Sequence, residues 1–147
     1  MKTTSSFDLV IFDCDGVLVN SEPLVNQIYV QMLGEFGFQV DANVKIAQVA
    51  EHFGDAIFSA TEVPHPKPAP DVYLAAAKAL NVSPDRCVVI EDSIPGVTAA
   101  IRAGMQVYGH AAFTSSESLR QAGAIPFANM LELQTILSDP NKIAIIQ

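Results

Sequence analysis

A run of four apolar residues, Leu9 to Phe12, leads directly into Asp13, Asp15 and Gly16 in the stretch LVIFDCDG. Four consecutive apolar residues are typical of a strand that is buried on both faces of a parallel sheet. The acids then fall at the carboxyl end of that strand, where open α/β sheets bind their ligands. A plain acidic turn is the simpler alternative, and it is common for one Asp but rare for the whole pattern. Because neighbouring buried carboxylates are costly without a cation or a shared proton, this strand end predicts a charged site.

Predicted strands and helices alternate along the rest of the chain. We expect strands at 56–60, 87–90 and 106–108, and helices at 24–36, 46–54, 70–80, 95–104, 117–121 and 129–137. Such alternation predicts an α/β fold with a parallel sheet and right-handed crossovers. The length of 147 residues suits a single domain, 1–147, in which residues 22–53 form linking helices. The tail KIAIIQ receives no assignment.

A second apolar strand also ends in acids, because CVVI is followed by Glu91 and Asp92. Parallel strands end at the same edge of a sheet, so these carboxylates and those of Asp13 and Asp15 are expected to converge. Hard oxygen ligands at that density select magnesium over zinc or copper. Lys67, in the stiff loop KPAP, would add a cation near the same edge. A magnesium ion, a lysine and a free carboxylate together suit phosphoryl transfer, which depends chiefly on neutralising charge.

Each of these residues also has a simpler interpretation. Glu91 and Asp92 could cap the helix that follows them, although Ser93 is equally free to cap it. Lys67 taken alone would be an ordinary surface lysine, and only its proline-rich setting and the neighbouring motifs favour a role. Three histidines lack ligand spacing and are interpreted as incidental: His52, His65 and His110.

Composition narrows the range of partners and compartments. A net charge of −8 with scattered Lys and Arg argues against nucleic acid or an anionic membrane as the main partner. Apolar runs are too short to span a bilayer, and Asp8 and Asp13 interrupt the region where a signal peptide would need its apolar core. We therefore expect a cytoplasmic protein whose two cysteines, Cys14 and Cys87, are buried reduced thiols.

Three segments resemble motifs of the haloacid dehalogenase superfamily. DCDGVLV resembles the first motif, KPAPDVYL the third and EDSIPGVTAAIRAGM the fourth, in the order that the family uses. The fourth has the form found in members with a helical cap, such as β-phosphoglucomutase-like and phosphoglycolate phosphatase-like enzymes. The resemblance covers residues 7–33 and 53–109. It implies a Rossmann-like core, here truncated, with residues 22–53 as a remnant of the cap.

The resemblance also implies roles for individual residues and a class of substrate. Asp13 would be the nucleophile that forms an aspartyl-phosphate, and Asp15 would be the general acid and base. Lys67 would balance the charge of Asp13 and the phosphoryl group. Magnesium would be bound by Asp13, the Asp15 carbonyl and Asp92, with Glu91 bound directly or through water. Because family dehalogenases lack the second Asp, Asp15 favours phosphate chemistry on a small phosphorylated metabolite.

One departure from the family pattern stands out. The second motif, a strand ending in a Ser or Thr that holds a phosphoryl oxygen, is missing between the first helix and KPAPD, together with most of the cap. Its loss would expose one edge of the strand 9–12, at which a second copy of the chain could pair. Alternatively, the strand 56–60 would pair with 9–12 and bring Ser59 or Thr61 beside the nucleophile.

Two functions from different classes therefore remain open. The first is a magnesium-dependent phosphohydrolase that works through an aspartyl-phosphate and is impaired by its missing parts. The second is a non-catalytic family member that keeps the metal site and acts by oligomerisation or partner binding. A receiver-like phosphoacceptor fails on order, since its lysine would come last, whereas Lys67 precedes Glu91 and Asp92.

Overall fold

The computed structural model describes residues 7–13, 56–129, 131–133, 137 and 142–146. The strands are β1 (Leu9–Asp13), β2 (Ile57–Phe58), β3 (Cys87–Glu91), β4 (Gln106–His110), β5 (Ile125–Phe127) and β6 (Lys142–Ile146). The helices are α3 (Asp71–Ala79), α4 (Ile94–Arg102) and α5 (Ser116–Gln121), with 3₁₀ turns at Ala60–Glu62 and Pro84–Arg86. Within this described part, no helix has both the length and the apolar character needed to cross a bilayer.

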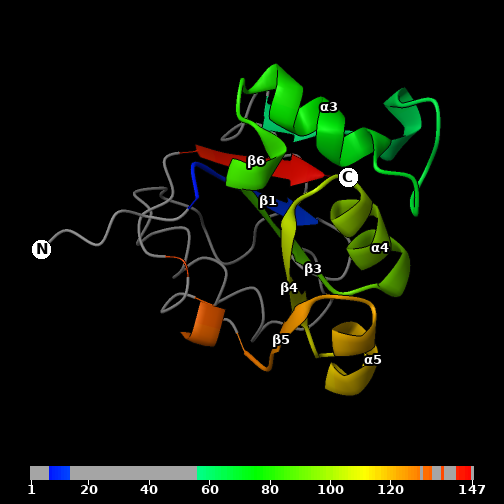
Figure 1. Ribbon diagram of the computed structural model, residues 1–147, viewed down its shortest axis with the longest axis vertical. Helices are drawn as coiled ribbons and strands as arrows, with labels where there is room; N and C mark the ends of the chain where they lie inside the picture. Colours follow the sequence, from blue (N-terminus) through cyan, green and yellow to red (C-terminus); the bar gives the residue numbers. More distant parts are fainter. Residues whose placement is uncertain (1–6, 14–55, 130, 134–136, 138–141, 147) are drawn as a thin grey trace, which may run out of the picture.

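All the strands belong to one sheet in the order β2-β6-β1-β3-β4-β5, and every neighbouring pair is parallel (Figure 1). The predicted α/β class with a parallel sheet is thus confirmed. Strand β1 lies in the middle of the sheet, and its residues Leu9 to Phe12 are fully buried, as the apolar run predicts. Both of its neighbours, β3 and β6, extend along nearly its whole length.

Helices α3, α4 and α5 cover the same face of the sheet (Figure 1). Side chains from alternate strand positions, among them Leu9, Ile11 and Val89, pack there against Tyr73 of α3 and Val97 of α4. The three helices lie on one face because the crossovers β2-α3-β3, β3-α4-β4 and β4-α5-β5 are right-handed and all progress in the same direction across the sheet. The side chains of Asp13 and Glu91 share this face, because they continue the same alternation.

Helix α4 begins with a serine cap. The Ser93 hydroxyl accepts a hydrogen bond from the backbone N–H of Gly96 at 3.2 Å, and Pro95 occupies the first turn. Both features favour a helix start. The free N–H groups of the first turn need hydrogen-bond acceptors, and a proline in that turn has no N–H group that would need one. Since Ser93 provides the cap, Glu91 and Asp92 are available for other contacts.

The C-terminal strand β6 occupies the place that was expected to be empty. Residues 142–146 pair with β1 on one side, with Asp13 opposite Ile146, and with β2 on the other, with Phe58 opposite Ile146. The predicted exposed edge of the strand 9–12 is therefore wrong, and so is its predicted pairing with 56–60. The unassigned tail supplies the missing strand, because its apolar sequence can be buried between two other strands.

Two further segments differ from the expected pattern. Strand β5 includes Pro126 and was not expected, but it is an edge strand, where a proline is tolerated because no ladder hydrogen bond is lost. In the expected helix 129–137, the described residues 131–133 are helical, and Leu133 and Leu137 are buried. The expected helices at 24–36 and 46–54, and with them the cap remnant at 22–53, lie outside the described residues.

Candidate functional site

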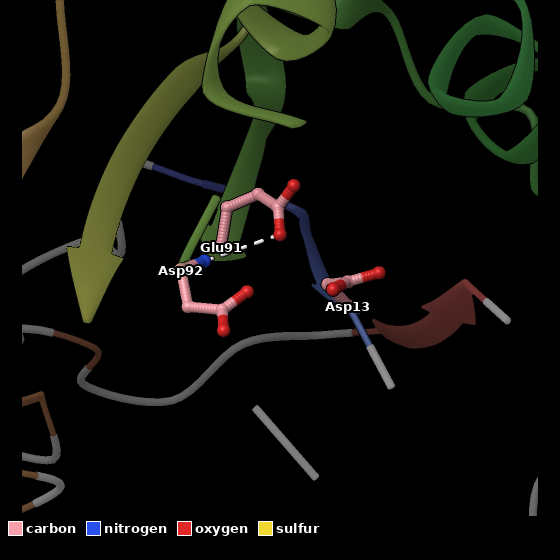
Figure 2. A group of neighbouring side chains, drawn as sticks. All are labelled: Asp13, Glu91 and Asp92. Atoms are coloured by element: carbon pink, nitrogen blue, oxygen red, sulfur yellow. Dashed lines mark hydrogen bonds between the residues drawn. The ribbon is translucent and has the colours of Figure 1, made fainter. Parts of the chain in front are cut away.

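The carboxylates of Asp13 and Glu91 lie side by side at the carboxyl edge of the sheet. Strands β1 and β3 are adjacent and parallel with Phe12 opposite Ile90, so the next residue of each strand reaches the same edge. Asp92 follows Glu91, and Figure 2 shows the three carboxylates gathered at the ends of the two strands. The convergence expected from the sequence is therefore present for these three acids. Asp15, the fourth, lies outside the described residues.

Lys67 brings a positive charge into this group. Its ammonium Nζ lies 2.9 Å from Asp13 Oδ1 and 3.3 Å from Glu91 Oε2, so one lysine bridges the ends of two strands. The side chain comes from the proline-rich loop before α3, in which the Lys67–Pro68 peptide is cis. That loop is attached to α4, because Arg102 Nη1 donates a hydrogen bond to the Pro68 carbonyl at 3.0 Å.

Glu91 is completely buried, and both of its carboxylate oxygens are hydrogen-bonded. Its Oε2 accepts from Lys67 Nζ at 3.3 Å, Tyr73 Oη at 3.3 Å and Ser93 Oγ at 3.2 Å, and its Oε1 accepts from the Asp92 N–H at 3.1 Å. A buried carboxylate needs such donors, because an uncompensated charge in a protein interior costs several kcal/mol. The orientation of Glu91 is consequently set by contacts from three different elements.

Gly96 makes the position of Glu91 feasible. A Cβ atom at residue 96 would overlap the Oε2 and Cδ atoms of Glu91 and would come within 2.7 Å of its Cγ. The glycine therefore allows the first turn of α4 to pass directly over the buried carboxylate. Positively polarised N–H groups at the start of that helix also favour a negative charge there.

The charges of the cluster do not balance. Three carboxylates and one ammonium leave a formal net charge of −2. Burial, together with the charge of Glu91, raises the pKa of Asp13 to about 8, although Lys67 opposes the change. Burial and the Glu91 charge likewise raise the pKa of Asp92 to about 6. Burial alone would lower the pKa of Lys67, but the charges of Glu91 and Asp13 outweigh it and raise this pKa.

The donor set fits a divalent magnesium ion. One carboxylate oxygen from each of Asp13, Glu91 and Asp92 lies within 4.8 Å of the others, which is close enough for a shared ion. All three are hard oxygen donors of the kind that magnesium prefers, and a charge of +2 would neutralise the formal excess. Among the described residues, no histidine or cysteine joins this group.

The described histidines and Cys87 do not belong to the group of Asp13, Glu91 and Asp92. His65 Nδ1 lies 3.0 Å from Asp71 Oδ2 at the surface, and His110 is buried and stacks on Phe127 with ring centroids 5.1 Å apart. Cys87 is a buried free thiol as predicted, and burial raises its pKa to about 11. Cys14 and His52 lie outside the described residues.

Comparison with known proteins gives the same resemblance as the motifs. A model of the family described as haloacid dehalogenase-like hydrolase matches residues 34–104. The fold is similar to the crystal structure of a haloacid dehalogenase-like protein of unknown function from Agrobacterium tumefaciens, with a TM-score of 0.64 and 24% identity, over 88% of this chain and 97% of that one. The chain is similar in sequence and in fold to haloacid dehalogenase-like proteins. The Rossmann-like α/β core expected from the motifs is the fold that it shares with them.

Two curated relatives show how much of the chain is shared. The chain is 46% identical over 85 residues to the chloroplastic protein SUPPRESSOR OF QUENCHING 1 of Arabidopsis thaliana. The aligned region covers 58% of this chain and 8% of the plant protein. The chain is 23% identical to the 6-phosphogluconate phosphatase of Escherichia coli, over 88% of the chain and 94% of the phosphatase. That alignment extends over 207 positions, more than the 147 residues here, so the phosphatase has segments without a counterpart in this chain.

The second motif of the superfamily has no equivalent beside Asp13 in the described residues. Its place next to β1 is taken by β6, which puts Ile146 opposite the expected nucleophile. Ser59 and Thr61, the suggested substitutes, follow β2 and are separated from β1 by β6. Their hydroxyl oxygens lie 2.8 Å apart in an exposed turn, where Ser59 also accepts from the Thr61 N–H. The hypothesis that either replaces the missing hydroxyl therefore loses its structural basis.

Magnesium should stabilise the protein more strongly at high pH than at low pH. The raised pKa of Asp13 means that the folded, metal-free protein keeps a proton that the unfolded chain has lost between about pH 4 and pH 8. Metal-free stability should therefore fall as pH rises through this range, and the carboxylate should become free to bind the ion. We expect a rise of several degrees in melting temperature on adding magnesium at about pH 8.5, and a much smaller rise at about pH 5.5.

The control for this measurement is Asp13→Asn, which removes the titrating group while keeping its shape. Thermal melts of both proteins with magnesium and with a chelator, at the same two pH values, give the comparison. An equal magnesium effect at both pH values in the unsubstituted protein would contradict the prediction.

Proposed function

We propose that the protein is a magnesium-dependent hydrolase of small phosphate esters that works through an aspartyl-phosphate on Asp13. The observation that carries this proposal is the short contact between Lys67 Nζ and Asp13 Oδ1, beside a carboxylate cluster at the edge of a parallel sheet. The match to a hydrolase family model and the similarity to a phosphatase support the same class of reaction.

In the proposed first step, a carboxylate oxygen of Asp13 attacks phosphorus and the bond from phosphorus to the ester oxygen breaks. The departing oxygen takes a proton from a general acid, a role that the family resemblance gives to Asp15. Water then attacks the phosphorus of the aspartyl-phosphate and gives a proton to the general base, again Asp15 by the family resemblance. The bond from phosphorus to Asp13 breaks, which releases inorganic phosphate and restores both carboxyl groups. Lys67 offsets the negative charge that the phosphoryl group brings next to Asp13.

Asp13 and Asp92 would hold the magnesium ion, with the Asp15 carbonyl, and with Glu91 either directly or through water. When bound, the ion would supply positive charge to the phosphoryl oxygens. Both oxygens of Glu91 already accept hydrogen bonds from protein donors, which favours the contact through water. A small phosphorylated metabolite is the proposed substrate class, in keeping with the phosphatase names of the relatives.

The position of Ile146 beside Asp13 is an argument for low catalytic activity, and it supports a second, non-catalytic candidate function. An isoleucine side chain has no hydrogen-bonding group, yet it is the residue opposite Asp13 in the register of β1 and β6. Without a hydroxyl there, a phosphoryl group would have one donor fewer than in relatives that keep the second motif. A non-catalytic member that keeps the metal site and acts by oligomerisation or partner binding is therefore the alternative.

Phosphate release from an aryl phosphate, measured with and without magnesium, tests the proposal. We expect slow magnesium-dependent release that falls by about a thousandfold or more in Asp13→Asn, because the nucleophile is lost. Circular dichroism should first show that both proteins are folded. If folded unsubstituted protein releases no more phosphate than the variant does, the hydrolase proposal is refuted and the non-catalytic alternative is favoured.

Three other expectations stay predictions: a cytoplasmic location, a single domain over residues 1–147 with a cap remnant at 22–53, and self-association through a sheet edge. In the described sheet the edge strands are β2 and β5, so pairing between copies would have to use one of them instead of β1.

A further inference from the structure

Tyr73 is a fully buried tyrosine in the first turn of α3, beside the Lys67 ion pairs. Its hydroxyl donates a hydrogen bond to Glu91 Oε2 at 3.3 Å. The face of its ring also lies next to Lys67 Nζ, which is 5.2 Å from the ring centroid. One side chain therefore contacts both members of the Lys67–Glu91 pair through two chemically different groups.

These two contacts restrict the position of the lysine. A lysine side chain is long and flexible, so holding its ammonium at one point requires several partners. Lys67 has Asp13 at 2.9 Å, Glu91 at 3.3 Å and the electron-rich face of the Tyr73 ring. The ring attracts the ammonium, and the tyrosine hydroxyl holds the carboxylate to which the ammonium is paired.

We propose that Tyr73 is a positioning residue that holds the Lys67 ammonium between Asp13 and Glu91. It acts through Lys67 and Glu91 and makes no contact with a phosphoryl group. Its expected effect on the reaction rate rests on the proposed hydrolase function, whereas its effect on the position of Lys67 does not. The simpler interpretation, that Tyr73 only fills the core, predicts that removing the hydroxyl leaves Lys67 unchanged.

Two substitutions separate the contributions of the hydroxyl and the ring. Tyr73→Phe removes the hydroxyl and keeps the ring, while Tyr73→Leu removes both and keeps an apolar side chain. Tyr108→Phe is the matched control, because Tyr108 is also buried and hydrogen-bonded, but its partner is Gln106. It removes a buried tyrosine hydroxyl from strand β4 and leaves the contacts of Lys67 and Glu91 in place.

The first readout is the side-chain nitrogen signal of Lys67 in NMR spectra, assigned by its absence from Lys67→Met. We expect proton exchange at this ammonium to speed up by roughly tenfold in Tyr73→Phe, because a charged hydrogen-bond network has lost one donor. In Tyr73→Leu the signal should also shift, because the neighbouring ring is gone. Tyr108→Phe should match the unsubstituted protein.

The second readout is the kinetics of aryl phosphate hydrolysis. Tyr73→Phe should lower kcat by about tenfold and change KM by less than about threefold, because the misplaced charge matters most in the transition state. If the Lys67 signal changes but the unsubstituted protein has no activity, the positioning role stands and the hydrolase proposal fails. If the Lys67 signal is the same in Tyr73→Phe, Tyr73→Leu and the control, the positioning role is refuted.

Discussion

Replacing Gly96 with alanine should destabilise the protein severely, by roughly 3–5 kcal/mol. The added methyl group would overlap the Glu91 carboxylate, so either helix α4 or the carboxylate has to move. Moving Glu91 would separate a buried charge from donors that include Lys67 and Tyr73. The cost is that of breaking a buried charged network, added to that of overpacking.

Urea unfolding of Gly96→Ala beside Gly104→Ala measures this effect. Gly104 follows the same helix, but a Cβ there would have its nearest contact at 4.0 Å from Pro84, and the glycine has a φ of +78°. Its replacement should cost only about 1–2 kcal/mol, through the left-handed backbone. Equal losses in the two variants would show that Glu91 does not lie beneath the start of α4.

The substitution Ile146→Asp should lower the free energy of unfolding by roughly 3–5 kcal/mol at neutral pH. Ile146 is fully buried and lies opposite Asp13 on one neighbouring strand and opposite Phe58 on the other. A carboxylate introduced there would take the place of a fully buried apolar side chain and lie beside the Asp13 carboxyl group. The loss should shrink at low pH, where the introduced carboxyl group can take up a proton.

Ile146→Val is the matched control, because it keeps an apolar β-branched side chain and should cost about 1 kcal/mol. Unfolding curves of both variants at neutral and acid pH give the comparison. A small and similar loss in both would mean that residues 142–146 do not complete the sheet between β1 and β2.

The sequence was sufficient to predict the acidic site because its information is local. An apolar run that ends in acids indicates both a buried strand and the edge at which that strand stops. Two such runs in a parallel sheet bring Asp13, Glu91 and Asp92 together without any knowledge of the turns between them. The serine at 93 likewise offered a cap within one helix turn, and the structure uses it.

Features that depend on contacts between segments far apart in the sequence could not be predicted in the same way. The pattern KIAIIQ is compatible with burial, but nothing within it indicates which strands it will join, and it pairs with residues near the opposite end of the sequence. Tyr73 faces the core, but the partner of its hydroxyl could not be predicted, because it depends on where Glu91 lies.

The position of β6 has a consequence for how the chain acquires its structure during synthesis. Strand β1, which carries the expected nucleophile, is made before the other described strands, but its neighbour β6 is made after all of them. Until then β1 and β2 lack the strand that separates them, and both have unsatisfied backbone groups on the facing sides. Contacts between segments so far apart in sequence form slowly, so β1 and β2 should stay open to wrong pairing until β6 has been made.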